Sequence, residues 1–155
     1  MSWKRAKDSS SKCRACAALQ HTHRGEEQEL LEFVKCFVHE HSEDWWLLRE
    51  HALHCSSSNT RRYLDCLLIS EKVRKRSVAP ESSMLAVELD GSSHGSNPFQ
   101  FGTDRVVAMF EQEQRDRDKD AELRRRGISS MRLCECSAES LILLHEQMDL
   151  IACTP

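Results

Sequence analysis

The segment Met84-Leu-Ala-Val-Glu-Leu-Asp90 decides how the fold is interpreted, because it places two carboxylates in an apolar run. In a β-strand successive side chains point to opposite faces, so Glu88 and Asp90 lie on one face, roughly 6.6 Å apart. The apolar residues that alternate with them lie on the other face. We therefore expect a buried strand that carries a pair of acids where it ends.

A third carboxylate lies in a second apolar segment, Tyr63-Leu-Asp-Cys-Leu-Leu-Ile69, which also predicts a buried strand. A carboxylate among apolar side chains is costly unless it is paired or bound to a metal. If the two strands are neighbours, Asp65 joins the two acids of the other strand, and three negative charges so close repel one another strongly. A divalent cation such as Mg²⁺ relieves that repulsion, and it can activate water and neutralise a phosphate under attack.

Ion pairs within the protein would explain the same residues without a metal. In that interpretation Asp65 pairs with Arg61, Arg62 or Arg132. The two acids of the other strand then only mark its end. The residues alone leave both interpretations open.

The spacing of apolar residues predicts three helices and one more strand. The helices cover residues 26–41, 103–126 and 137–151, and the strand covers 128–134. Gly127 stands where a glycine commonly ends a helix, and Ser137 suits a helix N-cap. Residues 45–48 fit a short strand or a helical turn, and residues 70–83 fit a long exposed connection.

The predicted order is helix-strand-strand-helix-strand-helix, which is typical of an α/β sheet covered by helices on both faces. We expect one such domain over residues 25–155, after a polar, flexible tail over residues 1–24. The chain has no apolar run long enough to span a bilayer and no secretory signal, so we expect an intracellular protein without a membrane partner. The eight cysteines are then reduced thiols, with Cys36 and Cys66 packed in the core.

The net charge of −3 and the pI of about 6.2 exclude a uniformly basic surface for nucleic acid. They leave room for a local basic face, because arginines and lysines gather at residues 61–62, 72–76 and 124–126. Near the N-terminus, Cys13 and Cys16 with His21 and His23 resemble half of a zinc site. No apolar module accompanies them, so structural zinc is not expected.

The helix over 103–126 carries charged residues on the face that must meet the sheet. Asp116, Lys119, Asp120 and Leu123 recur at intervals of three and four, so they share one side of the helix. Because Leu123 has to face the core, the acids and the lysine should lie near it. A solvated helix with internal ion pairs is the alternative.

Three segments together resemble the PD-(D/E)xK nuclease superfamily. They are Val-Glu-Leu-Asp-Gly-Ser-Ser-His (87–94), Gln-Arg-Asp-Arg-Asp-Lys-Asp-Ala-Glu-Leu (114–123) and Gly-Ile-Ser-Ser-Met-Arg-Leu (127–133). Within the superfamily the chain is most similar to the branch of very short patch repair endonucleases and related uncharacterised bacterial domains, over roughly residues 61–134. The resemblance implies a restriction-endonuclease-like core, a central mixed sheet flanked by helices, and a Mg²⁺-dependent endonuclease that cleaves DNA, with Mn²⁺ as a possible substitute.

The resemblance also implies roles for single residues. Asp65 matches the first catalytic aspartate, and Glu88 matches the acidic residue of the second half of the motif. Asp90 stands where many members carry lysine, so it binds metal, acts through water, or marks lost activity. Asp116 matches an acidic helix residue that assists the site, with Lys119 beside it.

Two further residues complete the expected site. His94 would act as a general base or orient a phosphate. In many members a glutamate of the first helix reaches the metal, and among Glu26, Glu27 and Glu29 we favour Glu27. The missing lysine and the acidic net charge also fit a catalytically inactive module of this fold that binds DNA or protein. The sequence does not separate DNA from RNA.

Overall fold

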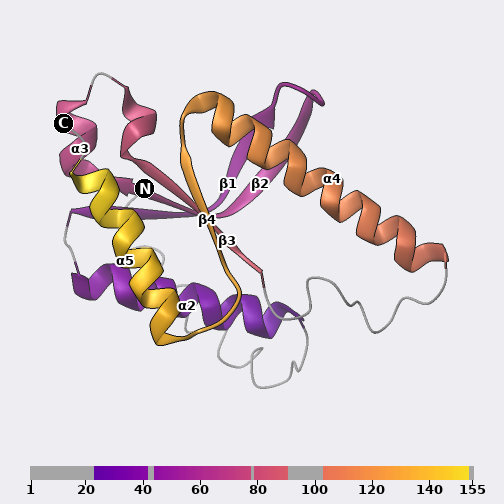
Figure 1. The fold of residues 1–155 in the computed structure, drawn as a ribbon, viewed down its shortest axis with the longest axis horizontal. Helices are drawn as coiled ribbons and strands as arrows, with labels where there is room; N and C mark the ends of the chain where they lie inside the picture. Colours follow the sequence, from indigo (N-terminus) through magenta and orange to yellow (C-terminus); the bar gives the residue numbers. More distant parts are fainter. Residues whose placement is uncertain (1–22, 42–43, 78, 91–102, 154–155) are drawn as a thin grey trace.

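The computed structural model describes residues 23–41, 44–77, 79–90 and 103–153 (Figure 1). Its elements, in chain order, are α2 (His23–His41), β1 (Trp45–Cys55), β2 (Thr60–Ser70), α3 (Glu71–Arg76), a 3-10 helix η1 (Pro80–Ser83), β3 (Met84–Leu89), α4 (Thr103–Arg126), β4 (Ser129–Leu133) and α5 (Ala138–Ala152). The predicted α/β class is confirmed. None of the described helices is both long enough and apolar enough to cross a membrane.

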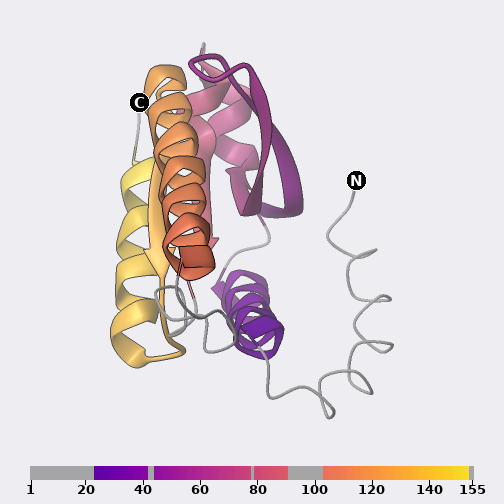
Figure 2. The ribbon, with the colours of Figure 1, turned by 90° about the vertical axis from the view of Figure 1, so that its right-hand side faces the viewer.

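The four strands form one open, mixed sheet in the order β1-β2-β3-β4. β1 pairs with β2 and β2 with β3 in antiparallel fashion, whereas β3 and β4 run parallel. A parallel pair needs a crossover connection, and α4 lies in the stretch of chain that joins β3 to β4. β4 is an edge strand of the sheet, and it runs between α4 and α5 (Figure 2).

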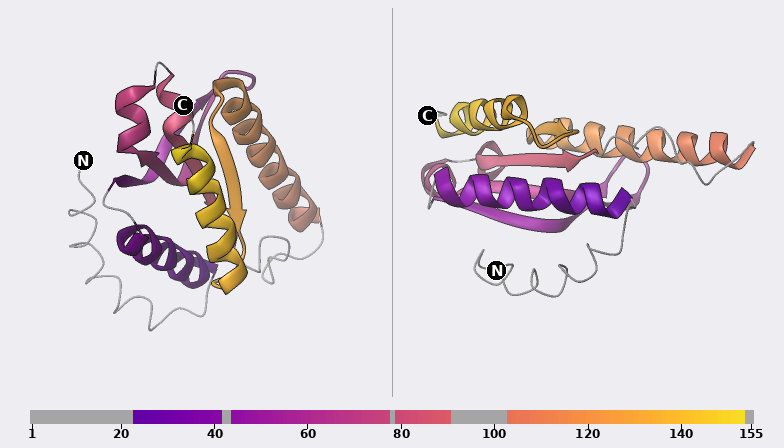
Figure 3. Two further views of the ribbon diagram at one scale, coloured as in Figure 1. Left: turned by 60° about the vertical axis from the view of Figure 1, so that its left-hand side comes forward. Right: turned by 90° about the horizontal axis from the view of Figure 1, so that it is seen from below.

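Helices cover both faces of the sheet, as the sequence predicts (Figure 3). One core cluster joins the sheet to α2 and α5, and a second joins the opposite face to α4 through Leu123. The alternation of β3 agrees with the prediction. Leu85, Val87 and Leu89 pack toward α2 and α5, whereas Ala86 packs in the α4 cluster. Glu88 therefore points to the face that α4 covers.

The sequence-based order lacked one strand. β1 covers the segment left open at 45–48 and continues to Cys55. The sequence did not reveal the whole strand, because exposed polar residues in its middle interrupt the apolar alternation. The expected exposed connection also contains α3, which Ser70 caps by accepting a hydrogen bond from the Val73 amide at 3.3 Å. The prediction for Cys36 was wrong, because its side chain is exposed, whereas Cys66 is buried as expected.

The predicted roles of Gly127 and Ser137 at helix ends are confirmed. Gly127 follows α4 with a φ of +72°, the left-handed conformation that glycine adopts most easily. The Ser137 hydroxyl caps α5 by accepting from the Ser140 amide at 3.2 Å. Leu144 and Met148 of α5 are buried in the core.

Candidate active site

The site lies where β2 separates from β3. Their pairing runs from Ile69 opposite Met84 to Cys66 opposite Val87, and no further. Next along β3, the Leu89 amide donates to a carboxylate oxygen of Asp65 at 2.8 Å. This side chain takes the place that a backbone carbonyl would occupy in a continued ladder. Asp65 is therefore fixed by the sheet itself at the point where the strands part.

The β1–β2 hairpin also changes its packing at this point. Leu64 belongs to the core cluster under α4, but Cys66, two residues later, belongs to the cluster under α2 and α5. Residues two apart normally share a face, so the strand turns over at Asp65. Opposite this region, Glu50 has a φ of +47°, which marks the same irregularity in β1. Because β2 is irregular at this point, the Asp65 side chain can turn toward β3 and the site.

Glu88 and Lys119 form the buried centre of the site. The Lys119 ammonium, which α4 supplies, donates a hydrogen bond to one oxygen of the Glu88 carboxylate. The two side chains are only 10% and 5% exposed, respectively. The second Glu88 oxygen, Oε1, is buried and has no hydrogen-bond partner among the described residues. Burying an acceptor without a partner is unfavourable, so this atom is the one most suited to a further ligand.

The charges around this centre are strongly coupled. The pKa of Glu88 is raised to about 7, chiefly by burial; the negative charge of Asp65 contributes to this rise, and Lys119 opposes it. Burial likewise raises the pKa of Asp65, and the negative charges of Glu27 and Asp90 add to that rise. The four acids expected to hold the metal therefore act on one another, and α2 contributes the fourth.

Arg132 of β4 ties the outer acids together. In the β3–β4 register it stands opposite Glu88. Its guanidinium pairs with Asp90 at 2.9 Å, with Asp120 at 3.4 Å and with Asp116 at 3.8 Å. Asp90 is thus beside the predicted metal site, but an arginine already neutralises its charge. The network joins the end of β3 to α4 through an edge strand.

The arginine partners considered for Asp65 are engaged elsewhere or exposed. Arg62 pairs with Asp118 at 2.9 Å, and Arg132 pairs with the outer acids. Arg61 is exposed. Within the described residues no lysine or arginine forms an ion pair with Asp65. The interpretation in which an arginine neutralises this carboxylate is therefore not supported.

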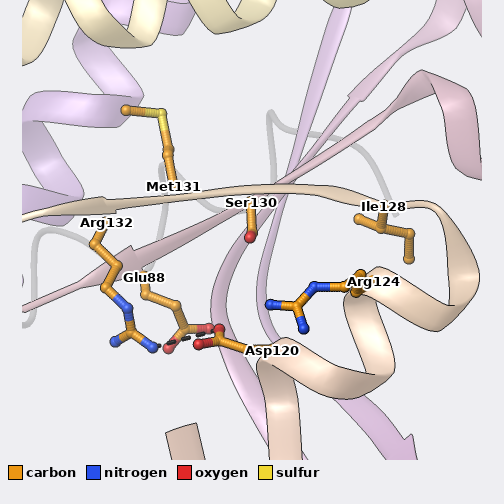
Figure 4. A pocket seen from close by; sticks show the side chains of 7 residues that line it. All are labelled: Glu88, Asp120, Arg124, Ile128, Ser130, Met131 and Arg132. Atoms are coloured by element: carbon orange, nitrogen blue, oxygen red, sulfur yellow. Dashed lines mark hydrogen bonds and ion pairs between the residues drawn. The ribbon is translucent and has the colours of Figure 1, made fainter. Parts of the chain in front are cut away.

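A pocket of about 380 Å³ opens beside Glu88, between the end of α4 and β4 (Figure 4). The side chains of Glu88, Asp120, Arg124 and Ser130 point toward a common space, and Met131 points away from it. From the sequence, Arg124 was expected only as part of the basic run 124–126, and Ser130 was not expected at the site. The spacing of Asp116, Asp120 and Arg124, each four residues apart, could have placed the arginine on the same side of the helix.

Other expected residues stand apart from the site or outside the described residues. His94, Cys13, Cys16 and His21 belong to the latter group. The basic run 72–76 lies in α3, which directly follows β2. Because Ile69, near the end of β2, pairs with Met84, α3 lies next to the start of β3. Glu88 lies at the other end of that strand, so the basic run does not flank the acids.

The donor set fits a hard divalent cation. No three acidic, histidine or cysteine side chains among the described residues form a ready metal-binding group. Mg²⁺ does not require one, because it commonly uses one or two carboxylates and completes its shell with water and phosphate oxygens. The unpartnered Oε1 atom of Glu88 and the nearby carboxylate of Asp65 are oxygen donors of the required kind.

The arrangement as a whole can bind a cation and an anionic substrate at one place. It offers carboxylates from two strands, an ammonium from a helix and two guanidinium groups at the rim. Comparison with protein-family models, curated proteins and solved structures found no match to this chain, so its residues and their geometry are the basis of the functional proposal.

Proposed function

We propose that this chain is a metal-dependent endonuclease that hydrolyses phosphodiester bonds in DNA, built on a core of the PD-(D/E)xK type. One observation carries the proposal. Asp65 of β2, Glu88 of β3 and Lys119 of α4 converge where the two strands part, and a buried oxygen of Glu88 lacks a partner. The mixed sheet flanked by helices is the kind of core that the sequence resemblance implies.

Asp65 and Glu88 would hold the cation, with Glu27 reaching it from α2. A bound Mg²⁺ or Mn²⁺ would supply charge neutralisation at the phosphate and activation of water. Asp65 is suited to a fixed position, because the Leu89 amide holds one of its oxygens. Glu88 is suited by its burial, since a carboxylate with a raised pKa gains most from a cation.

Lys119 would take the part of the lysine that is missing at position 90. Its ammonium already lies against Glu88, and the charges of Glu88 and Asp116 raise its pKa against the opposing effect of burial. It therefore stays protonated at neutral pH and can donate to a phosphate oxygen or to the attacking water. In this proposal the positive charge that the motif lysine would supply from β3 comes instead from Lys119 on α4, beside Glu88.

Arg132, Asp90 and Asp116 would act as positioning residues. The guanidinium contacts acids on both the β3 end and α4, so it holds the helix against the sheet. Asp116 lies 3.7 Å from the Lys119 nitrogen and restrains that side chain. Removing any of these groups would loosen Lys119 relative to Glu88.

A catalytically inactive module that binds DNA or protein is the second candidate. The observation that favours it is that Lys119 already neutralises Glu88 and Arg132 already neutralises Asp90. Such a protein would need no metal. Its melting temperature would not rise with millimolar Mg²⁺, whereas a protein that binds the ion in its folded state is stabilised by it.

Cleavage of supercoiled plasmid tests the proposal. The purified chain is incubated with Mg²⁺ or Mn²⁺, beside Asp65→Asn and Glu88→Gln, and beside Glu113→Gln as a control on the exposed side of α4. We expect metal-dependent cleavage by the wild type and the control, and a loss of about a hundredfold or more in both site variants. Equal cleavage by all four proteins would reveal a contaminating nuclease and leave the proposal without support. An RNA substrate and a single-stranded DNA in parallel identify the nucleic acid.

A further inference from the structure

One end of the pocket beside Glu88 is lined by the hydrogen-bond donors of Arg124 and Ser130 and differs from the acidic end at Glu88. Both side chains point into the space between α4 and β4 (Figure 4). The cavity of about 380 Å³ is within the range of ordinary small-ligand pockets and exceeds the volume of one phosphate group. It therefore has room for a phosphate together with part of the sugar that carries it.

Arg124 differs from the two arginines that follow it. Arg125 and Arg126 both pair with the buried Glu122 carboxylate, at 2.6 and 2.7 Å. The Arg124 side chain forms no ion pair or hydrogen bond with any described residue, although its guanidinium points into the pocket. A guanidinium offers a planar set of donors that matches the oxygens of a phosphate. Of three consecutive arginines, one is thus left with its charge directed at a cavity.

Ser130 and Arg132 add donors from the neighbouring strand. They stand two residues apart on β4, so their side chains share the face that looks toward α4. The Ser130 hydroxyl points into the cavity, while Arg132 is bound to the acids on its far side. Of the acids that also line the cavity, Glu88 pairs with Lys119, and Asp120 contacts Arg132, which it shares with two other aspartates. The end at Arg124 is therefore the place in the pocket where an anion meets the least repulsion.

The geometry points to a second phosphate-binding subsite, in which Arg124 and Ser130 hold a phosphate next to the one bound at Glu88. The assignment to a nucleic-acid strand rests on the proposed function, while the affinity of the pocket for phosphate does not. Consecutive phosphates of a strand could then occupy the acidic, metal-binding end and the Arg124 end of one continuous pocket. Free inorganic phosphate carries the same chemistry, so the two sources need separate tests.

Binding measured in EDTA tests the subsite without any cleavage. A fluorescent DNA oligonucleotide is titrated with the wild-type chain, with Arg124→Gln and with Arg117→Gln, at several salt concentrations. Arg117 is a matched control, because it lies two turns earlier on the same side of α4, is 70% exposed and is not among the pocket residues. We expect Arg124→Gln to bind about tenfold more weakly and to lower the salt-dependence slope by about 0.9 for duplex DNA, the value for one lost phosphate contact.

The outcomes separate this inference from the proposed function. If Arg124→Gln and Arg117→Gln bind the oligonucleotide with the same affinity and slope, the assignment of the subsite to a nucleic-acid strand is refuted, whether or not the wild type cleaves DNA. If only Arg124→Gln loses affinity but the wild type never cleaves, the subsite is supported and the nuclease proposal fails. Amide chemical shifts at Ser130 during titration with inorganic phosphate provide the second arm. A response to phosphate without any effect of Arg124→Gln on DNA binding overturns the assignment to a strand.

Discussion

Replacing Lys119 with methionine should destabilise the protein, and the loss should grow as the pH rises. The change keeps most of the length of the side chain but leaves the Glu88 carboxylate, which is 5% exposed, without the cation that contacts it. Removing one partner of a buried ion pair typically costs about 3–5 kcal/mol. Of the 5–15 kcal/mol or so that stabilises a domain, this is a large share.

Protonation of Glu88 sets the pH dependence of that loss. Its pKa in the folded protein is about 7, above the ordinary value of 4.5, chiefly because of burial. Between these values the folded state binds more protons than the unfolded state, so the free energy of unfolding falls as the pH rises. Without the lysine the pKa of Glu88 rises further and the window extends above pH 7. We expect Lys119→Met to cost about 3 kcal/mol at pH 8.5 and less at pH 6, where a proton relieves the buried charge.

Urea unfolding in EDTA measures this directly. Wild type, Lys119→Met, Glu88→Gln and the double variant form a cycle that isolates the pair. The double variant should lie within about 1.5 kcal/mol of the wild type, because neither charge of the buried pair remains. Lys72→Met, on an exposed residue, is the control. A cost below about 1 kcal/mol at pH 8.5, or the same cost at both pH values, would refute the reasoning that Lys119 compensates a buried carboxylate.

Three further changes probe the elements that hold the site. Glu122→Gln should lower the free energy of unfolding by about 2 kcal/mol at pH 7, because the buried carboxylate accepts from two arginines and from the Ser56 amide. Those hydrogen bonds hold its pKa well below 4.5, so the stability it adds is lost as the pH falls below about 4.5, and urea midpoints of wild type and variant should converge there. Gly127→Ala should cost about 1–2 kcal/mol, since φ is +72° and no atom lies in the way of the new methyl group; an unchanged melting temperature would contradict this. Arg132→Gln should reduce DNA cleavage by about tenfold, because it loosens the acids at the rim; wild-type turnover in the variant would remove its positioning role.

The sequence was sufficient to predict most of the strands of the sheet and to bring Asp65 and Glu88 together on neighbouring strands. Alternation in β3 placed Glu88 opposite the leucines, and helical spacing placed Lys119 near Leu123, because both depend on local geometry alone. β1 could not be recognised in full, since its middle residues are polar and exposed. The residue-by-residue alternation also gave no sign that β2 turns over at Asp65.

The partners of the outer acids could not be predicted, because they depend on tertiary contacts. Arg132 was considered for Asp65, but the parallel register of β3 and β4 brings it to Asp90 instead. Whether Glu27 or a neighbouring glutamate reaches the site depends on how α2 crosses the sheet. The negative charge of Glu27 raises the pKa of Asp65, and a role of Glu27 in metal binding stays a prediction. Helical spacing could have placed Arg124 on the same side of α4 as Asp116 and Asp120, but the pocket into which it points depends on tertiary packing.

Counting bound Mn²⁺ tests the central claim most directly, because it asks for the ion before any chemistry. Electron paramagnetic resonance of the free ion, titrated with wild-type chain, should show saturable binding that Mg²⁺ displaces. Asp65→Asn and Glu88→Gln should each weaken that binding at least about tenfold, as expected when a carboxylate ligand is lost. If the wild type binds no Mn²⁺ at millimolar concentration, or if both variants bind it as the wild type does, the carboxylates of β2 and β3 are not a metal site.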